Sequence, residues 1–242
     1  MAEAAVAVAS FEASLVDPAI RVAYLGYDCL ANGEFRMKKK VVVLHSGGLD
    51  STVCLLLARD RGYEVYSLGI DYNQRHHVEL DYAAAQCARF QVERRVIRVG
   101  WEKPVRVIPT KRSIAEIKKG VSPAFLPGRN GVFLMIACAE AAGLGADEVW
   151  TGINSVDFSG YPDCTPEFVE SFKKMLKYAI PNGPKLAAPL QRKSKIQIGR
   201  LAKRLGLESH DTWSCYRPQI RAGGIEPCGE CDACKLHNFA WS

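Results

Sequence analysis

One stretch constrains this chain more than any other: a short apolar run that passes directly into two glycines and a helix start. Residues 41–44 read Val-Val-Val-Leu, which is typical of a buried parallel strand. Gly47 and Gly48 permit backbone angles that a side chain would forbid. Residues 50–52, Asp-Ser-Thr, favour a helix start. Because free N–H groups converge at such a turn and the helix dipole favours negative charge, the stretch predicts an anion site.

An ordinary strand–helix turn with two glycines is the alternative, since many α/β domains contain one. Two details favour a binding loop. Ser46 and Ser51 bracket the turn with hydroxyl donors. The loop also lacks the Gly-Lys-Ser/Thr of a Walker A motif and the Gly-x-Gly-x-x-Gly of dinucleotide-binding turns, which excludes these two common phosphate loops.

Beyond this loop, segments with strand and helix character alternate along the chain. Further strands are expected at 63–70, 92–99 and 147–152, with a short extended segment at 184–190. Helices are expected at 51–60, 78–90, 132–142, 165–179 and 194–205. Such alternation predicts an α/β fold: a Rossmann-like parallel sheet with helices on both faces, and with ligands beyond the carboxyl ends of its strands.

The composition narrows the class of protein. With 48% hydrophobic and 24% charged residues in 242, it is that of a soluble globular protein. No apolar run approaches the length that spans a bilayer, so no membrane contact is expected. The net charge of +6 suits the handling of polyanions and is small for a nucleic-acid binder. Nine cysteines without a secretory signal favour a reducing compartment, so we expect a cytoplasmic protein whose clustered cysteines bind metal.

Several polar segments follow predicted strands, so a single crevice could gather them. Asp71 comes after the second strand, although an Asp in this place is more often a simple turn residue. Arg129 and Asn130 lie at a helix start, where Asn130 would cap the helix and Arg129 would suit a carboxylate or a phosphate. Lys195 belongs to a basic stretch, which is either a solvated face or a contact to a phosphate tail.

The loop after the fourth strand is polar and aromatic. Asp157, Tyr161 and Asp163 could recognise a heterocycle by stacking and by hydrogen bonds to ring N–H groups. The plainer interpretation is a surface loop that leads into a helix capped by Thr165. Cys164 lies in the same loop, but a lone loop cysteine is usually not catalytic.

Four cysteines near the carboxyl end have the spacing of a metal site. Cys215, Cys228, Cys231 and Cys234 form the pattern C-x12-C-x2-C-x2-C. Zinc prefers four soft ligands in a tetrahedron, which these thiolates supply. His237 is a rival of Cys215 as the fourth ligand. An iron–sulfur cluster is less favoured, because the ferredoxin run continues with Cys and Pro and this one does not.

The string Ser-Gly-Gly-Leu-Asp-Ser at 46–51 resembles the pyrophosphate loop (PP-loop) of the N-type ATP pyrophosphatases, a superfamily with many reactions. From about residue 40 onward the chain resembles one family within it, QueC, the 7-cyano-7-deazaguanine synthases. The matching pieces are 46–52, 71–76, 126–130, 157–168, 194–195 and 212–216, with Cys228, Cys231 and Cys234. The gap between Cys215 and Cys228 is longer than is usual in that family.

The resemblance implies a fold, a domain order and a reaction. The fold would be that of the adenine nucleotide alpha hydrolases, with residues 37–210 as the PP-loop ATP-binding domain and 211–242 as a zinc-binding segment packed on it. Residues 1–36 lie outside the resemblance and would be an N-terminal extension. The reaction would convert 7-carboxy-7-deazaguanine and ammonia to the nitrile through an adenylate and an amide, for queuosine or archaeosine synthesis. The implied cofactors are ATP, Mg²⁺ and Zn²⁺, and the implied assembly is a homodimer without direct nucleic-acid contact.

The motifs and the resemblance together predict roles for individual residues. Catalytic roles are predicted for Ser46, Asp50, Ser51 and Lys195. ATP contacts are predicted for Leu44, His45, Ser46, Gly47, Gly48, Leu49, Asp50, Ser51, Thr52, Val53, Cys54 and Asp71. Substrate contacts are predicted for Arg129, Asn130, Asp157, Tyr161 and Asp163. The predicted metal ligands are Cys215, Cys228, Cys231 and Cys234.

Two other functions stand as alternatives. A PP-loop enzyme that thiolates tRNA would need a catalytic cysteine pair and an RNA-binding domain, which Cys164 alone and a net charge of +6 meet poorly. A zinc- and nucleotide-binding module without turnover would bind ATP only, and the intact Ser/Gly/Asp loop argues against it.

Overall fold

The computed structural model describes residues 27–29, 35–74, 77–101, 108–155, 160–222 and 224–242. The chain divides into two units, Met1–Lys39 and Lys40–Ser242. In the first unit, β1 (Tyr27–Cys29) and β2 (Phe35–Met37) pair as an antiparallel ribbon. The second unit carries the sheet and all of the motifs described above.

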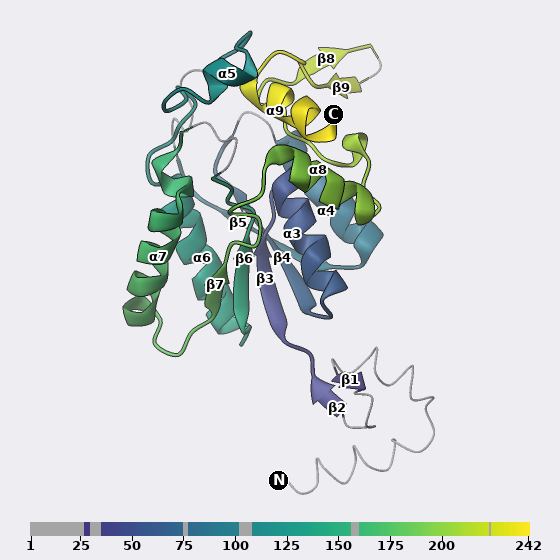
Figure 1. The fold of residues 1–242 in the computed structure, drawn as a ribbon. Coiled ribbons are helices and arrows are strands. Elements are labelled where there is room, and N and C mark those ends of the chain that lie inside the picture. Colours follow the sequence, from purple (N-terminus) through teal and green to yellow (C-terminus); the bar gives the residue numbers. More distant parts are fainter. Residues whose placement is uncertain (1–26, 30–34, 75–76, 102–107, 156–159, 223) are drawn as a thin grey trace, which may run out of the picture. The chain divides into compact units, whose positions relative to one another are not determined.

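The second unit is built on a five-stranded sheet of order β5-β4-β3-β6-β7, in which neighbouring strands run parallel (Figure 1). Its strands are β3 (Lys40–Leu44), β4 (Glu64–Asp71), β5 (Glu93–Arg98), β6 (Glu148–Thr151) and β7 (Lys185–Ala187). Val41, Val42 and Val43 of the central β3 are at most 1% exposed, which explains why this strand is continuously apolar. The predicted fold class is confirmed.

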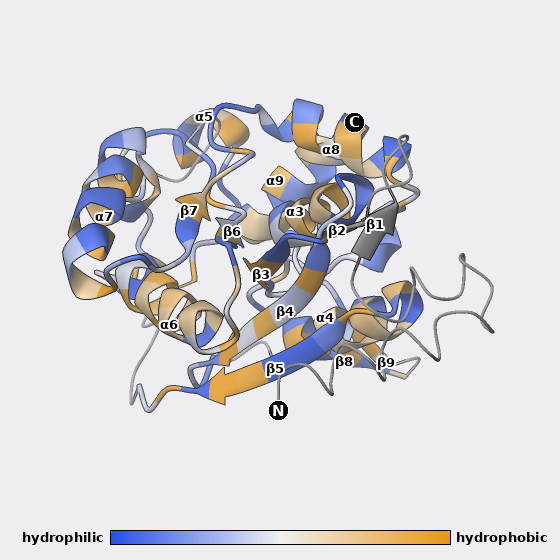
Figure 2. Cartoon of the chain, turned by 90° about the horizontal axis from the view of Figure 1, so that it is seen from below, coloured by the Kyte–Doolittle hydropathy of each residue, from blue (hydrophilic) through white to orange (hydrophobic). Residues whose placement is uncertain are grey.

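Helices cover both faces of this sheet (Figure 1). The helices on one face are α3 (Leu49–Asp60), α4 (Val78–Phe90) and α8 (Lys195–Arg204), and those on the other are α6 (Arg129–Gly143) and α7 (Pro166–Ala179). Side chains alternate along β3, so Val41 and Val43 pack with α3 and α8, whereas Val42 packs with α6 and α7. Figure 2 shows that α7 is amphipathic, with a hydrophilic outer surface.

The chain after α8 forms a C-terminal segment with its own small core of cysteines and Trp213. Its elements are η3 (Ser209–Asp211), β8 (Gln219–Arg221), β9 (Gly224–Glu226) and α9 (Asp232–Trp241). The antiparallel pair β8–β9 occupies the long gap between the first and second cysteines of the cluster. The helix α9 is not among the elements predicted from the sequence. It packs so closely on α8 that a Cβ on Gly199 would lie 1.8 Å from the Ala240 carbonyl oxygen.

The proline-containing segment between β5 and α6 is anchored to this C-terminal segment. It contains the short α5 (Ile114–Ile117), whose start is fixed by a capping box. Thr110 forms a β-bridge with Cys231, and Arg112 forms an ion pair with Asp232, whose side chain is 5% exposed. Two residues of this long connection, which is predicted to be irregular, therefore contact the segment that carries the cysteine cluster.

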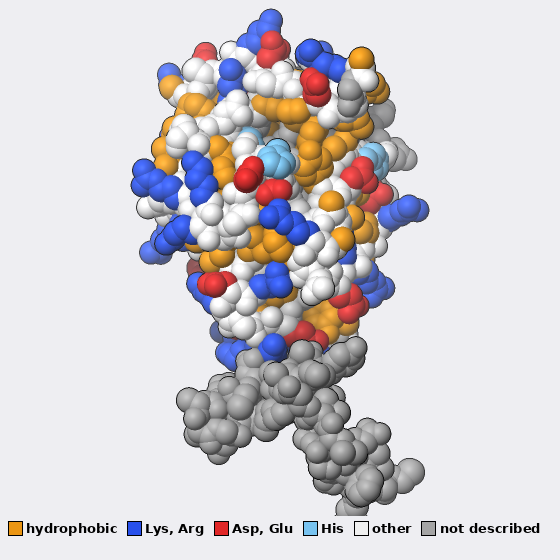
Figure 3. Space-filling model, turned by 90° about the vertical axis from the view of Figure 1, so that its right-hand side faces the viewer, with side chains coloured by type: hydrophobic (Ala, Val, Ile, Leu, Met, Phe, Trp, Pro, Cys, Tyr) orange, Lys and Arg blue, Asp and Glu red, His pale blue; other side chains and the backbone are white. Residues whose placement is uncertain are grey.

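Two features of the surface bear on partners. Among the described residues, no helix combines the length and the apolar character needed to cross a membrane. Figure 3 shows one side of the molecule, on which Lys and Arg side chains are scattered among neutral ones. The net charge of +6 is therefore not concentrated in one patch on this side.

Candidate functional site

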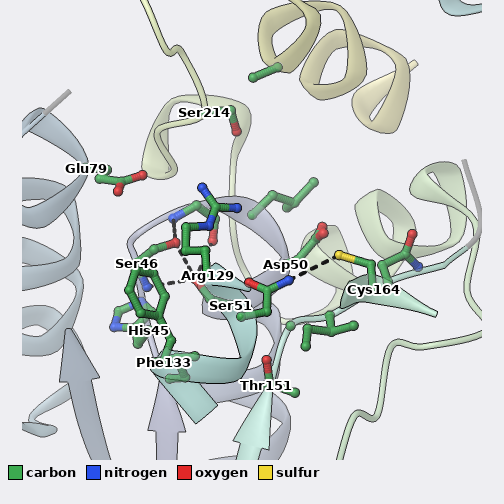
Figure 4. Close-up of a pocket in the computed structure, with 18 of the residues that line it drawn as sticks. His45, Ser46, Asp50, Ser51, Glu79, Arg129, Phe133, Thr151, Cys164 and Ser214 are labelled. Carbon is green, nitrogen blue, oxygen red and sulfur yellow. Dashed lines mark hydrogen bonds between the residues drawn. The ribbon is translucent and has the colours of Figure 1, made fainter. Parts of the chain in front are cut away.

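A cavity of about 320 Å³ opens at the carboxyl end of the sheet. It is lined by the ends of β3, β4 and β6, by the loop that enters α3, and by the first turns of α4, α6 and α8. Trp213, Ser214, Tyr216 and part of α9 line it from the C-terminal segment. Figure 4 shows side chains from these elements converging on it. The cavity lies where parallel sheets bind ligands, and two regions far apart in sequence wall it.

The loop between β3 and α3 is held in shape by its own hydroxyl groups. The Ser46 N–H donates to Ser51 Oγ at 3.2 Å, and the Gly48 N–H donates to Ser46 Oγ at 3.3 Å. The Ser51 hydroxyl donates to the Gly48 carbonyl oxygen at 3.0 Å. Gly47 has a φ of 91°, and a Cβ there would lie 2.2 Å from the Glu79 carbonyl oxygen, so only glycine fits. These contacts hold the start of α3 at the cavity, where its free N–H groups can bind an anion.

The fully buried imidazole of His45 braces this loop. Its Nδ1 lies 2.9 Å from Ser67 Oγ, and its Nε2 lies 2.9 Å from Gln86 Oε1. Gln86 Nε2 donates to the Gly47 carbonyl oxygen at 3.2 Å, which orients the amide so that its oxygen accepts from His45 Nε2. Burial, with the charge of Arg94, lowers the pKa of His45 to about 3, so the ring is neutral.

Asp50 and Lys195 form an ion pair between the first turns of α3 and α8, 145 positions apart. Their side chains are only 22% and 16% exposed. Asp50 Oδ2 accepts from the Lys195 ammonium, whereas Asp50 Oδ1 is buried without a hydrogen-bond partner among the described residues. Carboxylate oxygens are ligands that Mg²⁺ prefers, so Oδ1 fits a cation site at the helix start.

Arg129 enters the cavity from the first residue of α6. Its guanidinium carbon lies 5.9 Å from the centroid of the Tyr72 ring, and its Nη1 lies 3.4 Å from Tyr72 Oη. Tyr72 is itself only 4% exposed, so this cation–π contact fixes the guanidinium. A fixed, forked cation is suited to a carboxylate or a phosphate.

Asn130 and Asp163 are tied to each other. The Asp163 carboxylate accepts the Asn130 backbone N–H at 3.1 Å, and the Asn130 side-chain amide donates to the Asp163 carbonyl oxygen at 3.1 Å. The prediction that Asn130 caps the helix is wrong, because α6 begins at Arg129 and its cap is Gly128, with a φ of 74°. Asp163 is 6% exposed and does not belong to the cavity lining, so a substrate contact of its own stays a prediction.

Of the other candidate residues in the loop after β6, two line the cavity and one lies outside the described residues. Tyr161 lines the cavity, and its ring packs against Phe125 with centroids 5.2 Å apart. Cys164 also lines it, but burial raises the pKa of the thiol to about 12 and keeps it protonated. Asp157 lies outside the described residues, and its predicted substrate contact stays a prediction.

The residues predicted to contact ATP divide between the cavity and its surroundings. Those that line the cavity are Leu44, His45, Ser46, Gly48, Leu49, Asp50 and Ser51. Those that do not are Gly47, Thr52, Val53, Cys54 and Asp71. Val53 and Cys54 are 0% exposed inside α3, and the Asp71 carboxylate lies 3.6 Å from Arg98 Nε. The structure therefore does not bring the second group of side chains to the cavity.

Among the lining residues that sequence reasoning missed, two groups bear on the chemistry of the site. Glu79 reaches the cavity from the first turn of α4, and burial, only partly offset by the charge of Arg129, raises its pKa to about 7. Trp213, Ser214 and Tyr216 line it from the C-terminal segment. The aromatic run beside the first cysteine is a signal for the latter, whereas nothing in the sequence distinguishes Glu79 from an ordinary helix-surface carboxylate.

The four predicted metal ligands converge on one point. The Sγ atoms of Cys215, Cys228, Cys231 and Cys234 all lie within 4.8 Å of one another. Cys231 and Cys234 are 3.5 Å apart, and Cys228 and Cys234 are 3.9 Å apart. Zinc–sulfur bonds of about 2.3 Å require a tetrahedron with edges of about 3.8 Å, so the cluster fits a four-thiolate metal site.

His237 does not belong to this cluster. Its Nδ1 lies 3.1 Å from Ser214 Oγ, and its Nε2 lies 3.0 Å from Ser209 Oγ. Its ring lines the cavity instead. Of the two rivals for the fourth ligand, the geometry favours Cys215, to which the Cys228 N–H also donates at 3.2 Å.

Comparison with known proteins gives one consistent result. The family model for the queuosine biosynthesis protein QueC matches residues 40–242. The 7-cyano-7-deazaguanine synthase 2 of Rhodopseudomonas palustris (strain HaA2) is 60% identical over 204 residues, 84% of this chain and 97% of that protein. The 7-cyano-7-deazaguanine synthase of Novosphingobium aromaticivorans is 45% identical over 81% of this chain and 86% of its own length.

Solved structures match more loosely. The U34-tRNA thiolase NcsA from Methanococcus maripaludis, with its [4Fe-4S] cluster, matches with a TM-score of 0.47 at 18% identity, over 74% of this chain and 61% of that one. The family model, in contrast, matches from the first strand of the sheet through the cysteine cluster. The chain belongs to the QueC family.

Proposed function

We propose that this protein converts 7-carboxy-7-deazaguanine and ammonia to 7-cyano-7-deazaguanine at the expense of ATP, as a step of queuosine biosynthesis. The observation that carries the proposal is the 60% identity, over 97% of its length, to a relative named 7-cyano-7-deazaguanine synthase 2. The cavity supports it, because a helix-start anion site, a fixed guanidinium and aromatic side chains line the same space.

The first chemical step is activation of the carboxylate. A carboxylate is a poor electrophile, so its oxygen attacks the α-phosphate of ATP, and the resulting acyl adenylate releases pyrophosphate. The N–H groups at the start of α3, with the hydroxyls of Ser46 and Ser51, stabilise this leaving charge. Lys195 adds a cation, and Asp50 Oδ1 would hold Mg²⁺, which would supply further neutralisation of charge.

The residues on the opposite side of the cavity hold the acceptor. Arg129, fixed against Tyr72, binds the carboxylate of the deazapurine, and Tyr161 stacks on its ring. Asn130 and Asp163 position these two side chains by locking the start of α6 to the loop that carries Tyr161. Ammonia then replaces AMP to give an amide, and a second activation at the same site removes the amide oxygen to give the nitrile.

The cysteine cluster holds Zn²⁺ in a closed, structural site. Four thiolates leave no open position for substrate, so the ion stabilises the wall that contains Trp213 and Tyr216. We place the enzyme in the cytoplasm as a homodimer that acts on the free base. The tRNA-thiolating alternative is not favoured, since Cys164, with its protonated thiol, is the one cysteine that lines the cavity in the described part of the chain.

Mass spectrometry tests the reaction directly. Purified protein with 7-carboxy-7-deazaguanine, ATP, Mg²⁺ and ammonium is expected to form first the amide and then the nitrile. If ATP binds and neither product appears, the proposal is wrong.

A substitution at the ion pair tests the site. Asp50→Asn should lower turnover about 100- to 1,000-fold, because it removes the cation ligand and the partner of Lys195, as with other groups that stabilise transition-state charge. The matched control is Asp60→Asn, at the exposed end of the same helix, which should change neither turnover nor thermal stability. Equal loss of activity and stability in Asp50→Asn would indicate a purely structural pair.

A further inference from the structure

Two carboxyl groups line the cavity in the described part of the chain, and the activation step uses only one of them. Asp50 is paired with Lys195 at the start of α3. Glu79 enters from α4, and in the view of Figure 4 Arg129 lies between it and Asp50. Glu79 is thus close enough to Arg129, the residue proposed to bind the carboxylate that becomes the acyl group, for the two charges to interact.

One buried hydrogen bond orients the Glu79 carboxylate, and close packing holds the Glu79 backbone. Gln74, which is 1% exposed, accepts the Tyr72 backbone N–H at 2.9 Å and donates from Nε2 to Glu79 Oε1 at 3.2 Å. The backbone of Glu79 abuts the loop, since a Cβ on Gly47 would lie 2.2 Å from the Glu79 carbonyl oxygen. Glu79 therefore keeps a fixed position relative to the loop and to Tyr72, whose ring contacts the Arg129 guanidinium.

The charged and titratable groups that interact with Glu79 come from β5, from α6 and from the segments that carry Tyr72 and Tyr216. Arg94 of β5 and Arg129 of α6 favour the ionised form of Glu79. Burial raises the pKa values of the Tyr72 and Tyr216 phenols, and the negative charge of Glu79 raises them further. Burial outweighs the two cations and raises the Glu79 pKa to about 7. Near neutral pH such a carboxyl group exists in both forms, which suits it to accept and release a proton.

The proposed reaction needs a group of this kind. Ammonia in neutral water is mostly ammonium, a cation without a free electron pair that cannot attack a carbonyl carbon. A site for it needs a carboxylate to hold the cation and to take one proton, and aromatic faces add cation–π attraction. We propose that Glu79 forms the ammonium site of this enzyme and accepts the proton that frees ammonia for attack. The inference rests on the proposed function and deepens it.

Ammonium transfers one proton to the Glu79 carboxylate and becomes ammonia. The nitrogen electron pair forms the C–N bond at the acyl carbon, the bond from that carbon to the phosphate oxygen breaks, and AMP leaves with the electron pair. The nitrogen loses its surplus proton to water, which leaves the amide, and Glu79 returns its proton to solvent before the next ammonium binds.

Glu79→Gln separates this role from substrate binding. The amide has the size of the carboxyl group and keeps an oxygen for Gln74, but it can neither attract a cation nor accept a proton. With ammonium, amide formation should fall about 100-fold or more, the range of general-base contributions. Exchange of labelled pyrophosphate into ATP, driven by 7-carboxy-7-deazaguanine without ammonium, reports activation alone and should persist within about twofold, because no acid–base contribution to that step is lost.

Hydroxylamine provides the decisive comparison, because it is mostly neutral at pH 7.5 and needs no base to free its electron pair. Glu79→Gln should form the hydroxamate at nearly the wild-type rate while its ammonium reaction is lost. Asp81→Asn, exposed on the same helix, is the matched control and should behave as wild type with both nucleophiles.

Three results would overturn the inference: an unchanged ammonium reaction in Glu79→Gln, equal losses with ammonium and hydroxylamine, or a parallel loss of pyrophosphate exchange. The last would assign Glu79 to substrate binding. Failure of the proposed function is distinct, since wild-type protein would then show neither exchange nor hydroxamate.

Discussion

The two walls of the cavity are built in opposite ways. The loop at 45–48 lies between a central strand and a helix, and its shape follows from short-range hydrogen bonds among Ser46, Gly48 and Ser51. The C-terminal wall at 213–216 is itself neither helix nor strand, and its core consists of Trp213 and the cysteine cluster. One wall is specified locally by backbone geometry, and the other by four sulfur atoms brought together over 20 residues.

Because of this difference, each wall should be sensitive to a different kind of change. The loop depends on close packing, because neither Gly47 nor the buried His45 tolerates a change of size. The C-terminal wall would depend on the proposed metal, because its few apolar side chains alone cannot balance the entropy of ordering the chain. The walls meet where the Trp213 N–H donates to the Gly47 carbonyl oxygen at 3.1 Å, so damage to either should reach the other.

Removal of a metal ligand should have the largest effect. Cys215→Ala leaves three thiolates, so we expect the zinc content to fall from about one per chain to near zero and turnover to be lost, since closed sites depend on all their ligands. Elemental analysis and the mass-spectrometric assay measure both. Far-ultraviolet circular dichroism should change little, because the sheet and its helices have separate cores.

His237→Ala is the matched test of the ligand choice. It should keep the zinc, since its ring nitrogens face Ser214 and Ser209 instead of the cluster. Zinc lost from His237→Ala and retained by Cys215→Ala would reverse the assignment.

A methyl group in the loop should have the next largest effect. Gly47→Ala places a Cβ against the Glu79 carbonyl oxygen at a φ of 91°, so we expect a loss of about 2–4 kcal/mol in the free energy of unfolding, typical of strained or overpacked sites. Urea denaturation measures it. Gly143→Ala is the control, because a Cβ there meets nothing within 4 Å; its stability should be unchanged or slightly higher. Equal behaviour of the two variants would contradict the close packing of loop and helix.

The smallest effect concerns the buried His45 and appears only in acid. Its pKa is lowered from the ordinary 6.5 to about 3, so between these values the unfolded chain binds a proton that the folded protein does not. Stability from this group is therefore fully present above pH 6.5 and falls toward pH 3 by at most about 1.4 kcal/mol per pH unit. Thermal unfolding of wild type and of His45→Gln from pH 7.5 to 4.5 checks this: the variant should be less stable at pH 7.5 but less sensitive to acid. Parallel pH profiles would show that His45 is not buried and neutral.

The two walls also differ in how far sequence predicts them. The strand, loop and helix around Gly47 and Gly48 were predictable because their residues interact with near neighbours. The cysteine ligand set was predictable from spacing, although only the structure separates Cys215 from His237. α9 was not predicted, and its single cysteine, Cys234, was assigned only to the metal motif.

Features that depend on distant contacts were not predictable. His45 stands in the loop motif and its ATP contact stays a prediction, but the hydrogen bonds of its ring to Ser67 and Gln86, which the sheet and α4 bring to it, could not be foreseen. Glu79 has a role only because Gln74 and the loop aim it at the cavity. In both cases the environment, and not the residue type, decides what the side chain can do.

Amide hydrogen exchange with ligands bound tests most directly the central claim, that the two walls enclose one substrate. With ATP, Mg²⁺ and 7-carboxy-7-deazaguanine present and ammonium absent, peptides that cover residues 45–52 and peptides that cover residues 212–216 should both become protected relative to the free protein. Protection of the loop alone, with the C-terminal peptides exchanging as in the free protein, would contradict the claim and reduce the cysteine segment to a remote anchor.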